Sequence, residues 1–234
     1  MKKLLLFLFL LNRTFGASSQ SNADSLLHII RDAPESKKAE LFLQLSYKFK
    51  EDTSKSIAYS RIAYQFAVKN NQILLQAKAL CNQGEILYNS SDYHLAIPII
   101  EKALLTYNQS LDTVDIVNCH KLIGLCYYNM DQGDKAIIQF LEGMKLCENN
   151  SVLSAKLLSN IAATHTRMRN MVDAIYYYRK ALTINSSIKN LEGMAVNYNG
   201  LGEIYKIINQ PDSALINYKR SEEHTSELQS HLNL

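Results

Sequence analysis

The sequence predicts an all-α protein, a right-handed α-solenoid built from about five antiparallel helical hairpins. Its 234 residues are 47% hydrophobic and 20% charged, which is enough apolar material for a folded core. It contains only 3 Pro and 8 Gly, so it lacks the tight-turn residues on which β-sandwiches and barrels depend. Small side chains recur at a spacing of about 40 residues, and a fixed period of this length is typical of helical repeat proteins.

The charge balance argues against a nucleic-acid partner. Lys and Arg number 25 and Asp and Glu number 22, which gives a formal net charge of +3. This charge is too small to create the basic surface on which nucleic acids bind. No stretch reaches the ~18 consecutive apolar residues that span a bilayer. We therefore expect no nucleic-acid partner for this segment.

Residues 1–17 have the pattern of a secretory signal peptide. Two lysines precede an apolar run from Leu4 to Leu11, and small residues follow around Ala17. An interior helix is the alternative interpretation. The signal peptide predicts an exported protein that lies in the periplasm or on another extracytoplasmic side of a membrane.

Residues 22–36 predict a short capping helix and a linker ahead of the repeats. Apolar side chains between Leu26 and Ile30 give this segment one face that can cover the first repeat. The linker is expected over Ala33–Ser36, where Pro34 interrupts the helical pattern.

Self-similarity organises residues 37–219 into five repeats, which begin near residues 37, 77, 117, 155 and 195. Each repeat is expected to form two helices. Gly133 and Pro211 predict the turns between the two helices of the third and fifth repeats, because Gly tolerates positive φ and Pro suits the first turn of a helix. The segments that match place a small residue at repeat position 8 and a ring or aliphatic side chain at position 11: Gln83–Leu87, Ile123–Tyr127, Ile161–His165 and Leu201–Tyr205, with Leu43–Tyr47 as the most divergent copy.

This pattern resembles the tetratricopeptide repeat. In that family, small residues at positions 8, 20 and 27 let two helices approach, and larger side chains at positions 11 and 24 fill the space beside them. The resemblance covers residues 37–219, although the spacing exceeds the family's period of about 34 residues. It implies stacked hairpins, because a single hairpin cannot bury its own apolar face. It also implies a non-catalytic scaffold that binds protein or peptide.

The same resemblance implies a groove lined by the first helix of each hairpin, through positions 2, 5, 9, 12 and 13. These positions hold seven basic and two acidic residues, so an anionic protein or peptide partner is expected. A solvated face of mixed charge is the alternative. The first repeat contributes Leu41 and Leu45, among others. The candidate groove residues are Lys78, Glu85, Tyr88, Asn89, Asn118, Lys121, Tyr128, Asn129, Lys156, Arg167, Asn199 and Lys206.

Residues 220–234 differ in character from the repeats. Arg220–His231 resembles one translated frame of a common sequencing adapter, so we expect a non-native tail and a native protein that is truncated near Lys219. An ordinary polar tail is the alternative. Position 27 of the fifth repeat would be Ser221, and Glu222 follows it where an apolar residue is usual. The last hairpin is therefore predicted to lack its final turn and to fray.

The sequence shows no motif for catalysis, and we expect no enzyme activity, metal or cofactor. The four cysteines lack metal-ligand spacing, and Cys119 and Cys126 are expected to pack as small apolar groups. His165 stands where sister repeats have tyrosine, which predicts a core ring rather than a catalytic base. Gly200 and Gly202 lack the third glycine of a dinucleotide-binding loop.

Two functions are consistent with these observations. The first is a non-catalytic protein-binding or peptide-binding scaffold in an exported protein. The second follows from the signal peptide and the long repeats, which together resemble the extracytoplasmic sensor region of bacterial membrane histidine kinases and repeat-containing regulators. In that alternative, a membrane tether and an output domain belong to a missing part after Lys219.

Overall fold

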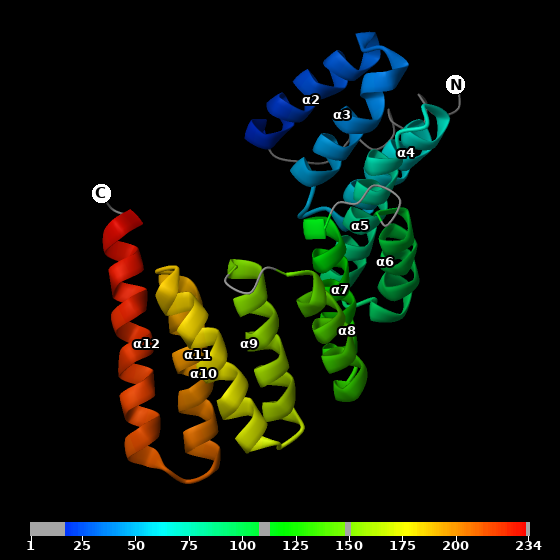
Figure 1. Ribbon diagram of the computed structural model, residues 1–234. Helices are drawn as coiled ribbons and strands as arrows, with labels where there is room; N and C mark the ends of the chain where they lie inside the picture. Colours follow the sequence, from blue (N-terminus) through cyan, green and yellow to red (C-terminus); the bar gives the residue numbers. More distant parts are fainter. Residues whose placement is uncertain (1–16, 108–112, 148–150, 233–234) are drawn as a thin grey trace. The chain divides into compact units, whose positions relative to one another are not determined.

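The computed structural model describes residues 17–107, 113–147 and 151–232, and the predicted signal peptide lies outside them up to residue 16. Every regular element in this described part of the chain is an α-helix (Figure 1), which confirms the all-α prediction. The helices are α2 (Ala17–Asp32), α3 (Glu35–Lys48), α4 (Thr53–Lys69), α5 (Ile73–Asn89), α6 (Tyr93–Tyr107), α7 (Thr113–Asn129), α8 (Gly133–Leu146), α9 (Val152–Arg167), α10 (Met171–Ser187), α11 (Leu191–Ile207) and α12 (Pro211–Leu232).

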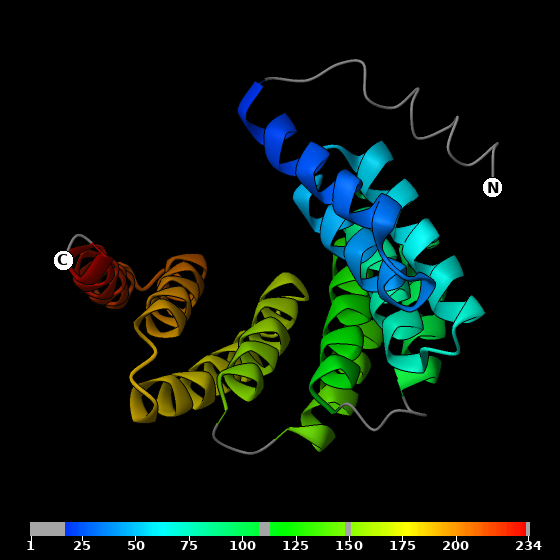
Figure 2. The ribbon, with the colours of Figure 1, turned by 90° about the horizontal axis from the view of Figure 1, so that it is seen from above.

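The chain divides into two compact units, residues 1–111 (unit 1) and residues 112–234 (unit 2). Unit 1 contains α2 and the hairpins α3–α4 and α5–α6, and unit 2 contains the hairpins α7–α8, α9–α10 and α11–α12. Within a unit, the second helix of one hairpin packs on the first helix of the next, as α4 does on α5 and α10 on α11 (Figures 1 and 2). This stacking is that of an α-solenoid, as predicted.

Helix α2 covers the first hairpin. Its buried residues Ala23, Leu26 and Ile30 belong to one apolar cluster with Phe42 of α3 and Tyr59 of α4. The helix begins at Ala17, five residues before the predicted start. The linker is also shorter than expected.

Only Ala33 and Pro34 separate α2 from α3. Pro34 holds φ at −62° directly before the first residue of α3, a value that the proline ring favours and that suits a helix start. Glu35 and Ser36, which were assigned to the linker from the sequence, therefore form the first turn of α3.

Close approach of two helices defines each hairpin. A Cβ atom added at Gly84 would overlap the side chain of Ile100, and one added at Gly124 would overlap the ring of Phe140. Gly202 faces Tyr218 in the same way. These pairs join repeat positions 8 and 24, so the predicted role of the small residue at position 8 is confirmed in three hairpins.

Many of the turns between helices contain a residue in the left-handed conformation. Within the described residues, the non-glycine residues with positive φ, between 53° and 65°, are Asn71, Ser91, Asp131, Arg169, Lys189 and Asn209. After each of them, the next backbone N–H donates to a carbonyl five residues back, as in the 2.9 Å bond from Gln132 to Tyr127. This bond closes the end of the preceding helix by satisfying one of its terminal carbonyl groups.

The prediction that Gly133 would have positive φ is wrong, because Asp131 has that conformation and Gly133 begins α8. The small size of Gly133 instead leaves room for Met168, whose side chain a Cβ atom would overlap. The prediction for Pro211 is confirmed, since this residue begins α12.

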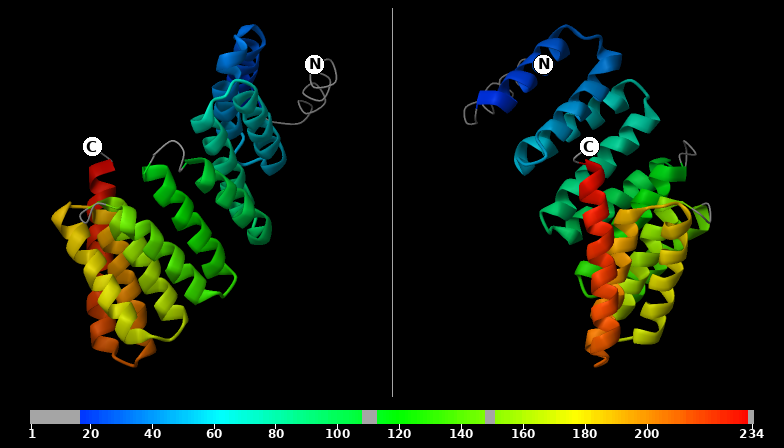
Figure 3. Two further views of the ribbon diagram at one scale, coloured as in Figure 1. Left: turned by 45° about the vertical axis from the view of Figure 1, so that its right-hand side comes forward. Right: turned by 90° about the vertical axis from the view of Figure 1, so that its left-hand side faces the viewer.

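The carboxyl-terminal helix does not end where the sequence suggested. α12 continues without interruption from Pro211 to Leu232 (Figure 3), so the predicted fraying after Lys219 is wrong. Ser221 donates a 2.8 Å hydrogen bond to the carbonyl of Ala195, and His224 stacks on Tyr198 with ring centroids 5.6 Å apart.

The physical reason is that no Gly or Pro follows Pro211 to stop the helix. Ser221 is also small enough for the close approach that position 27 requires. The resemblance of Arg220–His231 to a translated adapter stays a prediction.

Gly124→Ala should destabilise unit 2 by about 1 to 2 kcal/mol, because the added methyl group collides with the Phe140 ring and this overpacking exceeds the gain in helix propensity. The midpoint of urea-induced unfolding measures the change. Gly143→Ala is the comparison, since its Cβ would lie 3.3 Å from the end of the Leu157 side chain, which a small shift can relieve, and a smaller effect is expected. Combining Gly124→Ala with Phe140→Leu should recover stability; equal effects at Gly124 and Gly143 would contradict the close-approach interpretation.

Lys189→Gly should stabilise the protein by about 0.5 to 1 kcal/mol, because glycine adopts the left-handed conformation without the steric cost that a side chain carries. The same substitution at the exposed helical residue Lys180 should instead cost about 1 kcal/mol. Thermal unfolding of both variants provides the measurement. A lower melting temperature for Lys189→Gly would contradict the assigned turn conformation.

Candidate functional site

Four of the candidate groove residues of unit 1, those of the second repeat, lie on α5. Glu85 and Asn89 are exposed, and Lys78 and Tyr88 are half-buried. The Tyr88 ring lies 5.7 Å from the ring of Tyr93, at the start of α6. One helix therefore presents a cation, an anion, an amide and an aromatic ring.

One groove position of the first repeat is not accessible. Leu45 is 0% exposed and belongs to the apolar cluster that α2 completes. Its assignment to the groove face is wrong, because α2 and α4 bury the side of α3 on which it lies. Leu41, at position 5 of the same repeat, remains partly accessible.

The predicted residues of unit 2 lie on the first helices of its three hairpins, and all of them are at least partly exposed. Half-buried side chains occupy α7 and exposed ones occupy α9 and α11. Lys121 donates a 3.0 Å hydrogen bond to Asn118, one turn earlier on α7. The residues on the three helices are Asn118, Lys121, Tyr128 and Asn129 on α7, Lys156 and Arg167 on α9, and Asn199 and Lys206 on α11.

Arg167 is the groove residue with the most defined surroundings. Its Nε atom lies 2.6 Å from Oδ1 of Asp131, in the turn between α7 and α8. Its guanidinium carbon lies 4.9 Å from the ring centroid of Tyr128, a distance typical of a cation–π contact. The sequence indicated Tyr128 and Arg167 but gave no sign of Asp131, because a turn residue lies outside the repeat positions.

The basic excess of the groove is therefore smaller than the residue count suggested. Arg167 pairs with Asp131, and Lys38 of the first repeat pairs with Glu35 at 2.9 Å. Both acidic partners lie outside the groove positions, so a count over those positions leaves them out. Lys156 and Lys206 stay exposed on the first helices of their hairpins.

A side chain from a second helix also reaches this face. The fourth repeat has Ala162 at position 8, where three other repeats have glycine. Tyr178, at position 24, directs the end of its ring at Gly200 of the next repeat, where a Cβ atom would overlap the ring carbon Cζ. The sequence predicted Tyr178 only as a space-filling ring; the unusual Ala162 together with Gly200 is the signal that could have found it.

The surroundings of the Tyr178 hydroxyl perturb its ionisation. Burial is the largest of the effects that raise the pKa of Tyr178 to about 12. The neighbouring Tyr128 and Glu203 act in the same direction, and a hydrogen bond with Thr166 opposes them. All three neighbours occupy groove positions, so the hydroxyl lies at the groove face of unit 2.

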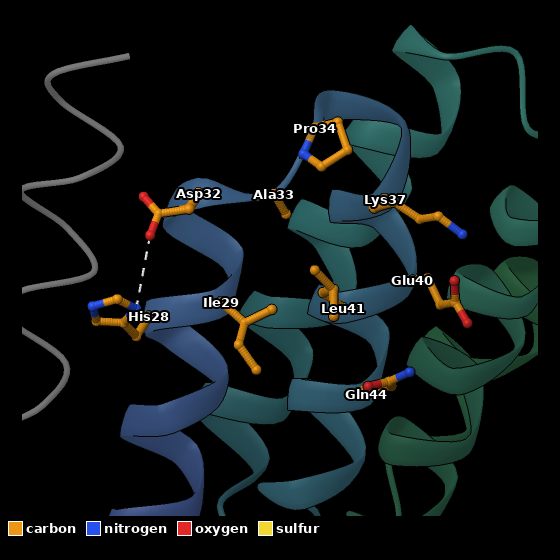
Figure 4. Close-up of a pocket in the computed structure, with 9 residues that line it drawn as sticks. All are labelled: His28, Ile29, Asp32, Ala33, Pro34, Lys37, Glu40, Leu41 and Gln44. Carbon is orange, nitrogen blue, oxygen red and sulfur yellow. Dashed lines mark ion pairs between the residues drawn. The ribbon is translucent and has the colours of Figure 1, made fainter.

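An open hollow lies between α2 and α3 in unit 1 (Figure 4). Its volume is about 660 Å³, within the range of small-molecule and side-chain pockets. Ile29 is 52% exposed there, and His28 lies 3.8 Å from Asp32 at the rim. Of its residues, the sequence indicated only Leu41. The lining consists of His28, Ile29, Asp32, Ala33, Pro34, Lys37, Glu40, Leu41 and Gln44.

The residues with reactive side chains are used in packing. His165 stacks on Tyr177 with centroids 5.5 Å apart and planes 6° apart, which fits its predicted role as a core ring. Cys119 and Cys126 are buried and form no disulfide with each other, and burial raises the pKa of Cys126 to about 11, which keeps its thiol protonated.

The described ranges contain neither a candidate metal site nor a helix suited to span a membrane. Within residues 17–107, 113–147 and 151–232, no group of three or more His, Cys, Asp or Glu side chains could hold a metal ion. Over the same residues, no helix has both the length and the apolar character needed to cross a bilayer.

Two models of one family match the chain. Both are described as tetratricopeptide repeat, and they match residues 77–109 and 153–227. The chain is a tetratricopeptide repeat protein. The second match covers hairpin α9–α10 and extends through α11 into α12, and the first covers hairpin α5–α6.

Solved structures share this tetratricopeptide repeat fold. BtubC (BKLC) from P. vanneervenii has a TM-score of 0.80 at 12% identity, over 92% of this chain and 93% of that one. A Rap protein complexed with Competence and Sporulation Factor has a TM-score of 0.65 at 13% identity, over 89% and 70%.

A third similar structure is a signal transduction ATPase with a tetratricopeptide repeat sensor, from Pyrococcus horikoshii. It has a TM-score of 0.68 at 17% identity, over 85% of this chain and 35% of that one. Identities this low show a shared fold alone. None of the curated proteins matches the chain.

Raising the pH should reveal the raised pKa of Tyr178. Because its pKa is higher in the folded chain than the value near 10 of an unfolded one, the stabilisation is complete below pH 10 and is lost as the pH rises to about 12. The loss amounts to about 1.4 kcal/mol per pH unit at most.

Tyr178→Phe should therefore lose less stability than the wild type between pH 9 and 11, measured as the shift in the urea midpoint. Tyr176→Phe, at an exposed ring, should behave as the wild type; identical slopes for all three proteins would contradict the assignment.

Proposed function

We propose that this tetratricopeptide repeat protein is a non-catalytic scaffold that binds an anionic protein or peptide on the first helices of its hairpins. The observation that carries the proposal is the accessible row of cationic and amide side chains in unit 2. Lys156 and Asn199 are exposed, and Lys121 is partly exposed beside Asn118. Cations attract acidic groups of a partner, and amides can both donate to and accept from a peptide backbone.

The fold and the chemistry of the described residues support a binding role over catalysis. The family's hairpins are a scaffold whose exposed first helices are suited to contact a partner. The similar Rap structure is a complex with Competence and Sporulation Factor, so the same fold holds a ligand in that protein. The reactive side chains singled out above, His165 and the buried cysteines, serve packing.

Export is the second part of the proposal. It rests on the basic start and the apolar run within residues 1–17. Fusion of residues 1–40 to a phosphatase that folds only outside the cytoplasm tests it, and export of the fusion should raise phosphatase activity in whole cells. Replacing Leu6 and Leu8 with Asp should abolish that activity, and an active Asp variant would contradict a signal peptide.

A sensor region is the second candidate function. The similar structure from Pyrococcus horikoshii, a signal transduction ATPase with a tetratricopeptide repeat sensor, favours it. An output domain encoded after Lys219 in the genomic reading frame would support this candidate. An in-frame stop codon close to that position would leave the free scaffold as the function.

Reversing charge in unit 2 tests the binding face. The triple variant Lys121→Glu, Lys156→Glu and Arg167→Glu should reduce capture of partners from the source organism's lysate by about tenfold or more, because repulsion replaces attraction.

The control reverses the same number of charges on second helices, at the exposed residues Lys145, Lys180 and Lys219. Circular dichroism establishes that both variants fold. Equal capture by the two variants would discard the proposed face.

A further inference from the structure

The contact between Arg167 and Asp131 suggests how the binding face of unit 2 recognises an acidic group. Arg167 ends α9, at repeat position 13, and is 43% exposed. Two sides of its guanidinium are occupied: one face by the Tyr128 ring at 4.9 Å and the Nε edge by Asp131 at 2.6 Å. Within the described chain, the terminal amino groups of Arg167 have no hydrogen bond to a residue other than Asp131.

This arrangement holds the guanidinium in one orientation before a partner arrives. A planar guanidinium matches a carboxylate through two parallel N–H donors, and an arginine already held by stacking loses less conformational freedom when it binds. Tyr128 supplies that stacking from the neighbouring hairpin. Arg167 is therefore better prepared to bind a carboxylate than Lys156 or Lys206, whose ammonium groups are exposed point charges.

Asp131 is a weakly held partner for Arg167. Its side chain is 72% exposed, and an exposed ion pair contributes little to stability because water screens it. Asp131 belongs to a turn and has φ of 58°, so its side chain can rotate away without disturbing a helix. It already provides a carboxylate to Arg167, the same chemical group that an acidic partner would bring.

We propose that Arg167 is the residue that recognises an acidic side chain of a bound peptide, and that Asp131 is an intramolecular competitor occupying it in the free protein. This inference rests on the proposed binding function. The carboxylate of a partner Asp or Glu binds the terminal amino groups of Arg167, and Asp131 lowers the affinity by neutralising the guanidinium. Tyr128 positions the guanidinium through its ring, so its hydroxyl is dispensable.

The neighbouring groups define what can lie beside that acidic side chain. Glu203 is close enough to Tyr178 to raise the pKa of its hydroxyl, and it faces the same side of the unit. A second acidic residue near Glu203 would be repelled. Thr166, directly before Arg167, is half-buried and its hydroxyl donates to the carbonyl of Ala162, so it can accept a hydrogen bond from a peptide N–H.

Selection of a random 12-residue peptide library displayed on phage, with the full chain as bait, provides the probe. Wild-type protein should enrich peptides with Asp or Glu at one position. Replacing that acid with its amide in a selected peptide should weaken binding about tenfold, measured by fluorescence anisotropy. Arg167→Gln should bind both forms of the peptide equally and weakly.

The direction in which Asp131→Asn changes the affinity for the acidic peptide distinguishes a competing carboxylate from an ion pair that only stabilises the fold. Asparagine keeps the acceptor oxygen and removes the charge, so this variant should bind the acidic peptide about threefold or more tightly than the wild type. Tyr128→Phe should leave binding unchanged, and Tyr128→Leu should weaken it. Lys180→Gln, on the exposed face of α10, is the control for a general loss of positive charge.

Several results would overturn the proposal. One alternative is that the ion pair only stabilises the packing of the α7–α8 turn against α9. In that case, Asp131→Asn and Arg167→Gln will lower the melting temperature by similar amounts, and neither variant will alter the preference for acidic peptides. Enriched peptides without an acidic position would refute this inference and the anionic character of the partner, and would leave a peptide-binding scaffold standing. A selection that enriches no peptide would refute both.

Discussion

The fold depends on one contact, in which the side chain at repeat position 24 lies against a backbone that has almost no side chain at position 8. Gly84, Gly124 and Gly202 provide that backbone for Ile100, Phe140 and Tyr218. The contact sets the distance between the two helices of a hairpin and directs their apolar sides toward each other. The outward side of each first helix takes no part in this contact, and the residues proposed to bind a partner lie on that side. Packing inside the hairpin thus decides which residues stay accessible.

The functional chemistry is found where a repeat departs from this rule. Ala162 occupies position 8 of the fourth repeat, and Tyr178 extends instead toward Gly200 of the fifth. The hydroxyl of Tyr178 lies near Thr166 and Glu203. Gly200 of the fifth repeat has no side chain and leaves room for the ring, whereas position 8 of the fourth repeat is occupied by Ala162. Arg167 is likewise held by residues of the preceding hairpin rather than by its own. Identical repeats would offer identical faces, so these differences between neighbours are what can give the surface a preference for one ligand.

The fold followed from the sequence because its information is local and periodic. Helix positions, the pairing of helices and the role of the small residues were all readable from spacing. Two errors came from judging residues by type alone: Gly133 was expected to take positive φ that Asp131 takes, and residues after Lys219 were expected to fray although nothing stops the helix. The site was less predictable. Exposed groove positions could be read from the pattern, but Asp131 and Tyr178 depend on contacts between hairpins, and the hollow beside Ile29 depends on the packing of α2 on α3, which no single repeat encodes.

The contact at positions 8 and 24 also has a consequence for the way the chain folds. Gly124 and Phe140 are 16 residues apart in sequence, and the other pairs have the same separation. Contacts so close along the chain give a low contact order, which corresponds to small loop-closure entropies and rapid folding. A hairpin can form before its neighbours and then serve as a surface on which they assemble. We expect hydrogen exchange to be slow in a hairpin that packs against a neighbour on each side, as α9–α10 does against α8 and α11.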